Sequence, residues 1–178
     1  MVTFETVVEI VPVIGLTIAL LYYAMNLRNQ NITRKAQLTM NFYTHVTKRE
    51  FWQQFINVVF HQQFKTIEEW DEKYGPQENP DAATDLYTTM QIFEGAGTLL
   101  KEGVIEADLL FRYLPKIIIG TAWERYEPWI TGLRASYNDP MFGEMFEYLK
   151  DEAKKQYPDI KKPRFEDTSD SPILKKVR

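Results

Sequence analysis

Glu94 is the residue whose type and position offer the best prospect of chemistry. It follows Phe93 at the edge of an apolar pattern that recurs with helical spacing. A partly buried carboxylate at this position needs a cationic partner, because an unpaired charge is costly to remove from water. The candidates for an ion pair or a shared ligand site with Glu94 are three arginines: Arg112, Arg125 and Arg134.

We predict an internal ion pair at Glu94 and no catalytic residue. A catalytic carboxylate with a raised pKa is the alternative, and it would need a second acid, a base or a nucleophile in a supporting position. The sequence shows no such pattern around Glu94. We therefore expect a protein that is not an enzyme, and keep a ligand pocket between helices near Glu94 as the alternative.

The histidines and glycines predict neither a metal site nor a cofactor site. A di-iron helical bundle uses Glu-x-x-His pairs, but Phe42 precedes His45 by three positions and Val58 precedes His61 by three. The glycines of residues 95–97 (GAG) follow no strand pattern, and no phosphate-binding lysine follows them in the required pattern. We expect these glycines to allow close packing of helices.

Composition and charge exclude several classes of function. The chain of 178 residues has no cysteine, which excludes disulfides, thiolate metal sites and cysteine nucleophiles. Residues 28–65 hold six Lys or Arg and one acid, whereas residues 66–111 hold eleven acids and two lysines. A nucleic-acid footprint requires clustered Lys and Arg on the domain, so we expect no nucleic-acid partner.

The N-terminal region predicts a transmembrane helix. Residues 10–27 carry no charge, and a helix over residues 7–27 would be roughly 31 Å long, close to the thickness of a bilayer core. A cleaved signal peptide and a buried core helix are the alternatives. The first is disfavoured because the chain starts with acids and the apolar run ends in tyrosines and arginines.

The distribution of Lys and Arg predicts the orientation of this helix. Residues 1–9 contain none, whereas Arg28, Arg34 and Lys35 follow the apolar run. By the positive-inside rule, the N-terminus lies outside and the C-terminal side lies in the cytoplasm. We therefore expect a single-pass protein of the cell membrane, with the lipid bilayer as one partner.

Helical patterns account for most of the remaining chain. Capping-box sequences at residues 47–50 (TKRE) and 66–69 (TIEE) predict helix starts, as does Asn79 before Pro80. Further helices are expected over residues 106–114 and 115–135, and a last one from Asp139-Pro140 to about Tyr157. The β-branched run at residues 117–119 leaves a strand as an alternative, although no partner strand exists for it.

The predicted fold class is all-α, with one N-terminal transmembrane helix followed by a cytoplasmic multi-helix bundle. Residues 1–27 form the tail and anchor, and residues 28–157 form the helical domain. Residues 158–178 contain three prolines and six Lys or Arg, the composition of a disordered tail.

Several of these features resemble a known but uncharacterised family. The resemblance rests on residues 35–38 (KAQL), 93–94 (FE), 103–105 (GVI), 123–124 (WE) and 133–134 (LR), together with the apolar segment before them. The family that the chain resembles consists of prokaryotic single-span membrane proteins with a helical cytoplasmic domain of unknown function. The resemblance implies the fold and the topology, and it brings no activity with it.

Three hypotheses of function follow. The first is a membrane-anchored, non-catalytic interaction module, a scaffold or accessory subunit of a membrane complex, with a protein partner or self-association through helices. The second is an enzyme or small-ligand receptor with a pocket near Glu94. The third is a membrane-active effector.

Overall fold

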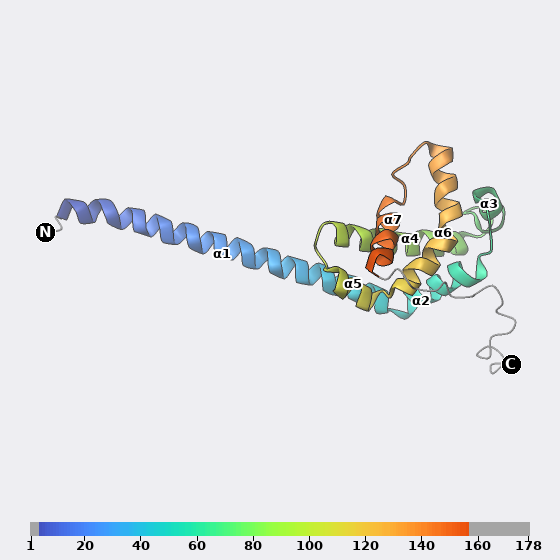
Figure 1. Ribbon diagram of the computed structural model, residues 1–178, viewed down its shortest axis with the longest axis horizontal. Helices are drawn as coiled ribbons and strands as arrows, with labels where there is room; N and C mark the ends of the chain where they lie inside the picture. The colour runs from blue at the N-terminus through green and yellow to red at the C-terminus, as the bar shows by residue number, and fades with distance from the viewer. Residues whose placement is uncertain (1–3, 157–178) are drawn as a thin grey trace. The chain divides into compact units, whose positions relative to one another are not determined.

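The computed structural model describes residues 4–156, with side chains from Pro12 onward, and all of its regular elements are helical (Figure 1). The all-α prediction is therefore confirmed for this part of the chain. The elements are α1 (Phe4–Thr47), α2 (Arg49–Ile56), the π-helical turn η1 (Asn57–His61), α3 (Ile67–Tyr74), α4 (Pro80–Lys101), α5 (Ala107–Tyr113), α6 (Lys116–Tyr137) and α7 (Glu144–Gln156).

The chain divides into two units, Met1–Phe42 and Tyr43–Arg178. The predicted boundary after residue 27 falls inside α1, which continues to Thr47 without interruption. The predicted disordered tail, residues 158–178, lies outside the described residues.

The predicted transmembrane helix is the main correction. No helix in the described part of the chain is both long enough and apolar enough to cross a membrane. This finding overturns the predicted anchor and the predicted single-pass location with an external N-terminus and a cytoplasmic domain.

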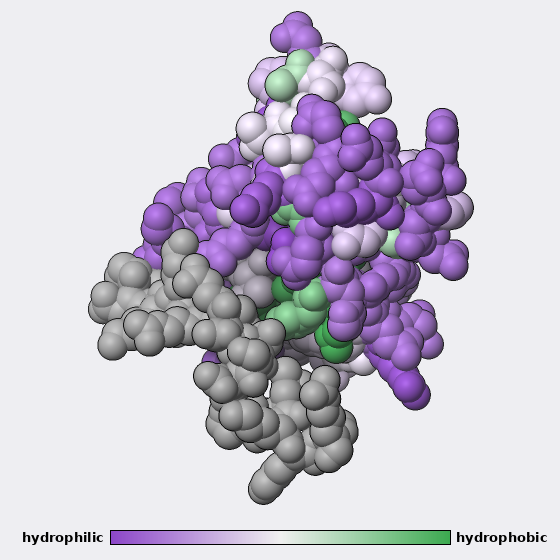
Figure 2. All heavy atoms as spheres, turned by 90° about the vertical axis from the view of Figure 1, so that its right-hand side faces the viewer, coloured by the Kyte–Doolittle hydropathy of each residue, from purple (hydrophilic) through white to green (hydrophobic). Residues whose placement is uncertain are grey.

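The core of the second unit lies between α4, α6 and α7. Helix α4 packs along α7, and α6 packs against both α7 and α3. The largest side chains of this core are fully buried: Leu86, Phe93, Tyr126, Trp129, Ile130 and Phe146. Phe93 and Phe146 stack with ring centroids 4.6 Å apart, which joins α4 to α7. The face of the protein drawn in Figure 2 is largely hydrophilic, as expected over such a core.

Two of the predicted helix starts are confirmed by their caps. Thr66 Oγ1 accepts a hydrogen bond from the backbone N–H of Glu69 at 3.2 Å, and the Glu69 carboxylate accepts one from the N–H of Lys65 at 2.9 Å. At the start of α4, the Asn79 side chain accepts a hydrogen bond from the N–H of Ala82 at 3.1 Å. Both caps satisfy donors that helix geometry leaves unpaired.

A helix does start within residues 47–50, as predicted, but without the predicted capping box, and the predicted start of the last helix is wrong. Thr47 directs its hydroxyl back to the carbonyl oxygen of Tyr43 at 2.9 Å, and the residue that precedes α2 is Lys48, which makes no side-chain cap. The last helix begins at Glu144 instead of Asp139-Pro140. Residues 138–143 form a turn with positive φ at Asn138 and Gly143, so the chain reverses before α7 starts.

Helix α6 resolves the alternative left open at residues 117–119. These β-branched residues lie in the first turns of α6, which also continues through Pro128. Ile119 is fully buried in the core. Tertiary packing therefore outweighs the strand propensity of the run.

Candidate functional site

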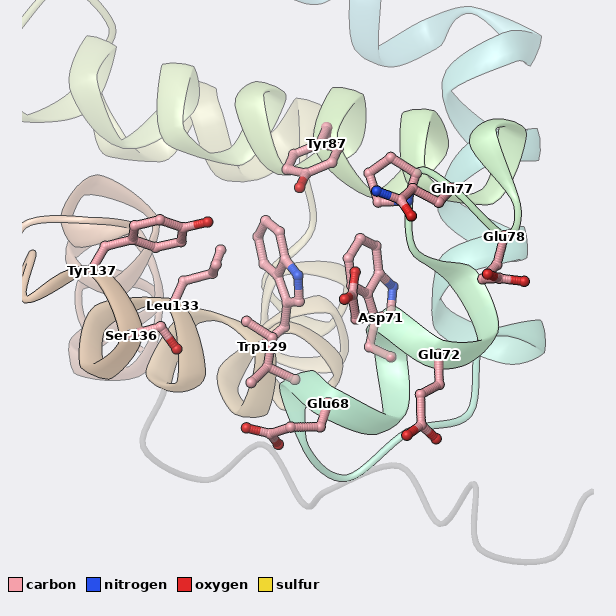
Figure 3. Close-up of a pocket in the computed structure, with 13 residues that line it drawn as sticks. Glu68, Asp71, Glu72, Gln77, Glu78, Tyr87, Trp129, Leu133, Ser136 and Tyr137 are labelled. Carbon is pink, nitrogen blue, oxygen red and sulfur yellow. The ribbon is translucent and has the colours of Figure 1, made fainter.

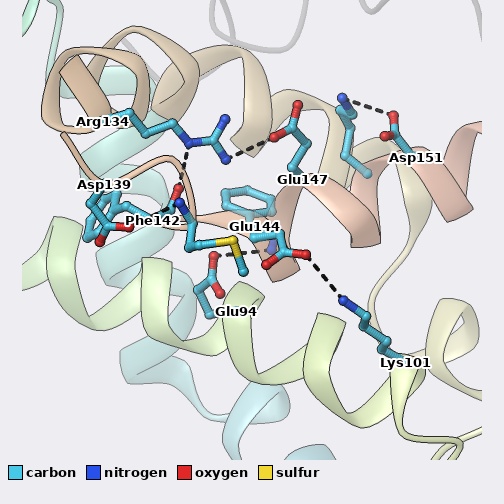
Figure 4. A network of polar contacts seen from close by, with 11 residues as sticks. Glu94, Lys101, Arg134, Asp139, Phe142, Glu144, Glu147 and Asp151 are labelled. Atoms are coloured by element: carbon cyan, nitrogen blue, oxygen red, sulfur yellow. Dashed lines mark hydrogen bonds and ion pairs between the residues drawn. The ribbon is translucent and has the colours of Figure 1, made fainter.

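The carboxylate of Glu94 lies at the junction of α4 and α7. Its Oε1 accepts a hydrogen bond from the backbone N–H of Phe146 at 3.2 Å (Figure 4). Phe146 is in the first turn of α7, where backbone N–H groups have no partner within the helix. Burial raises the pKa of Glu94 above its ordinary value, partly opposed by hydrogen bonds from the N–H groups of Phe146 and Met145. Glu94 therefore acts as a cap supplied to α7 by another helix.

Arg134 stabilises the turn that leads into α7. Its Nε donates a hydrogen bond to the carbonyl oxygen of Phe142 at 2.7 Å, and its Nη2 lies 2.9 Å from Oε2 of Glu147 (Figure 4). The positive charge of Arg134 also lowers the pKa of Glu94, but less than burial raises it. Arg134 is therefore near Glu94 and engaged with other partners.

The other two arginines lie elsewhere in the fold. Arg125 donates from Nε to the carbonyl oxygen of Val59 and from Nη2 to Oε1 of Gln63, both at 3.2 Å. Arg112 is exposed on α5. Among the described residues, no hydrogen bond or ion pair joins Glu94 to any of the three arginines. The Glu94 carboxylate is satisfied by backbone donors, and a ligand there stays a prediction.

Of the two glycines near Glu94, Gly95 and Gly97, only Gly97 is needed for the packing of helices. A Cβ on Gly97 would overlap the backbone oxygen of Met145 and lie 2.6 Å from its carbonyl carbon, whereas a Cβ on Gly95 would meet nothing within 4 Å. Gly97 thus permits the close approach of α4 and α7. The prediction of close packing is confirmed for Gly97 only.

The described residues contain no group of three or more metal-ligating side chains placed to hold a metal ion. His45 and His61 are both exposed, His45 on α1 and His61 in η1. Three aromatic residues of α6, Trp123, Tyr126 and Trp129, are buried in the core. Tyr126 donates its hydroxyl hydrogen to the carbonyl oxygen of Leu86 at 3.3 Å and also contacts the Thr89 hydroxyl.

A cavity that the sequence did not reveal lies between α3, α4 and α6. Its volume is about 660 Å³, within the range of small-molecule sites. Aromatic side chains and carboxylates line it together (Figure 3). The residues that matter most are Glu68, Asp71, Glu72, Tyr87, Trp129 and Tyr137. No local motif in the sequence connects the acids with Trp129.

Trp129 is unusual among the cavity residues. Its side chain is fully buried, yet its Nε1–H has no hydrogen-bond partner. The neighbouring Trp70 is also buried, but its Nε1–H donates to Oε1 of Gln62 at 3.1 Å. Since buried N–H groups are normally paired, the unpaired indole N–H of Trp129 is an exception that calls for an explanation.

These features define an all-α protein whose second unit is a helical domain, with helix caps supplied across α4 and α7 and a cavity between α3, α4 and α6. The chain belongs to the family described as a domain of unknown function, DUF4760, whose model matches residues 9–153. The resemblance to an uncharacterised family is thereby confirmed. No curated protein and no solved structure matches the chain.

Proposed function

We propose that the protein is a non-catalytic helical interaction module that acts as a scaffold or accessory subunit through its long helix α1. The observation that carries this proposal is the exposure of large apolar side chains along α1: Val13, Ile14, Leu16, Ile18, Leu20, Leu21, Tyr22, Tyr23, Met25 and Leu27. Exposed apolar patches of this extent mark interaction sites on proteins. A prokaryotic source, implied by the resemblance, stays a prediction.

The arrangement of these side chains favours more than one partner helix. Residues 20–23 are consecutive and all exposed, and consecutive residues of an α-helix point about 100° apart. The apolar surface therefore surrounds α1, and a helix that is apolar on every side is normally buried on every side. A single partner helix would cover one side and leave the others in water, so we infer an assembly of several helices.

The free energy available from such burial is comparable with the cost of association. Fully burying one Leu, Ile or Val side chain contributes about 1.5–3 kcal/mol. Five or six such residues on α1 would together contribute about 8–18 kcal/mol, which is of the same order as the cost of association, about 4–15 kcal/mol. The partner helices are either copies of α1 or helices of another protein.

The alternative of a receptor or enzyme at Glu94 has less support. Oε1 of Glu94 is already engaged by the N–H of Phe146, and the cavity between α3, α4 and α6 does not include Glu94 in its lining. A structural role for Glu94 explains its position.

Charge substitutions on α1 test the proposal. Leu16 and Leu20 are 63% and 59% exposed, so Leu16→Glu with Leu20→Glu removes apolar surface without disturbing a packed core. We expect sedimentation velocity to show a smaller particle for this double variant than for the natural chain. The control, Gln30→Glu with Gln37→Glu, adds the same charge to exposed polar positions of α1 and is expected to keep the assembly. Equal particle size in both double variants would contradict a role for the apolar surface.

A further inference from the structure

The lining of the cavity between α3, α4 and α6 is strongly acidic. Glu68, Asp71 and Glu72 come from α3, and Glu78 comes from the loop before α4. No Lys, Arg or His is present in the described lining. Hydrogen bonds from its own backbone N–H and from Thr66 lower the pKa of Glu68, which keeps that carboxylate ionised at neutral pH. The cavity therefore favours a positively charged occupant.

Aromatic rings form the opposite part of the lining. Tyr87 of α4 and Tyr137 of α6 are exposed, and Trp129 of α6 lines the cavity with them (Figure 3). The rings of Tyr87 and Trp129 meet edge to face with centroids 5.3 Å apart. The exposed tyrosine rings offer faces that attract cations, and aromatic rings combined with acids are the usual lining of sites for ammonium ions.

The buried indole of Trp129 gives a second and independent indication of a ligand. Trp129 is one of the residues that line the cavity, and its buried Nε1–H has no acceptor among the described residues. In Figure 3 the ring nitrogen of Trp129 lies on the side of the ring toward Asp71. A buried donor without a partner is costly, and a ligand with a suitably placed acceptor removes that cost.

We propose that this cavity binds a small organic ammonium ion that also carries a hydrogen-bond acceptor. The ammonium group lies between the carboxylates of α3 and the rings of Tyr87 and Tyr137, and the acceptor receives the hydrogen bond of Trp129 Nε1–H. The site is independent of α1, so it stands apart from the interaction proposed for that helix. Its proposed role is recognition.

Matched pairs of cationic and neutral probes test the charge requirement. Choline and acetylcholine carry a quaternary ammonium and an oxygen acceptor, whereas 3,3-dimethylbutan-1-ol and its acetate ester have the same shape without the charge. Calorimetric titration of the full chain is expected to show saturable binding of at least one cationic probe and at least tenfold weaker binding of its neutral partner. Equal binding within both pairs, or no saturable binding of either cation, would overturn the proposal.

Exposed residues provide variants that leave the core intact. Glu72→Gln removes one carboxylate of the lining, and Tyr137→Ala removes an aromatic face that is 76% exposed. Each is expected to weaken binding of the cationic probe by threefold or more. Glu102→Gln makes the same charge change at an exposed position outside the cavity lining and should leave the affinity unchanged. Equal weakening by Glu72→Gln and Glu102→Gln would show a general charge effect and contradict the site.

The indole proton of Trp129 supplies a readout at a single atom. The chain has four tryptophans, and therefore four indole N–H signals in a nitrogen–proton correlation spectrum. We expect the bound cation to shift the Trp129 signal downfield as its hydrogen bond forms, with a smaller effect on Trp52. A shift confined to the other indoles would overturn the assignment of Trp129 as the donor.

Discussion

The carboxylate of Glu94 on α4 accepts a hydrogen bond from the backbone N–H of Phe146 on α7, with 3.2 Å between Oε1 and N. The first turn of α7 is thus capped by a side chain from a different helix. An ion pair between Lys101 and Glu144, with 3.3 Å between Nζ and Oε1, joins the same two helices. Gly97 lets the two helices approach closely. The hydrogen bond to Glu94, the ion pair of Lys101 with Glu144 and this close approach together hold α7 on α4.

Substitutions at Glu94 should separate its role as acceptor from its charge. Glu94→Ala removes the acceptor, and we expect a loss of about 1 kcal/mol in the free energy of unfolding at neutral pH, as for other helix caps. Glu94→Gln keeps an oxygen acceptor and should cost less. Urea unfolding followed by circular dichroism measures both values, and a larger loss for Gln than for Ala would contradict the capping role.

The pH dependence of stability should report the raised pKa of Glu94. Burial raises this pKa above 4.5, so the folded state holds the proton more tightly than the unfolded state does. The resulting contribution to stability is full below the unfolded pKa and is lost as pH rises through the folded pKa. Relative to Glu94→Gln, the natural chain should therefore lose stability as the pH rises from about 4.3, the ordinary pKa of a glutamate, through the raised pKa of the folded state. A difference that is constant or that changes in the opposite direction would contradict this account.

The two glycines of α4 should respond to alanine in opposite directions. Gly97→Ala places a methyl group against the backbone of Met145, and overpacking of this kind costs about 1–3 kcal/mol. Gly95→Ala meets open space and should gain up to about 1 kcal/mol from helix propensity. Thermal and urea unfolding of both variants check the sign. Stabilisation by Gly97→Ala would show that α4 and α7 do not approach as described.

The capping box of α3 should have a measurable effect of its own. Thr66→Ala removes the acceptor for the N–H of Glu69, and the expected cost is about 1 kcal/mol in the free energy of unfolding. Thr98→Ala is the control, since the Thr98 hydroxyl only donates to the Glu94 carbonyl oxygen within α4, at 2.9 Å. An equal or smaller loss for Thr66→Ala would argue against the cap.

Local signals in the sequence predicted local structure well. The caps at Thr66 and Asn79 were predictable because a cap requires only residues within one turn of each other. The start of α7 was not, because it depends on the turn at residues 138–143 and on Arg134 and Glu94, which come from other helices. The expected partner of Glu94 was an arginine, whereas backbone donors satisfy it.

The cavity illustrates a second limit of sequence reasoning. Its acids lie on α3 and the unpaired indole on α6, and no spacing rule relates residues that only the fold brings together. The predicted membrane anchor is a further correction, because no helix in the described part of the chain is both long enough and apolar enough to cross a membrane.

The mass of the native particle tests the proposed role of α1 most directly. The full chain, purified from its natural source, would be measured by native mass spectrometry. We predict a particle heavier than the single chain of 21.0 kDa, containing further copies or a second protein in fixed proportion. A bare single chain would contradict the interaction module.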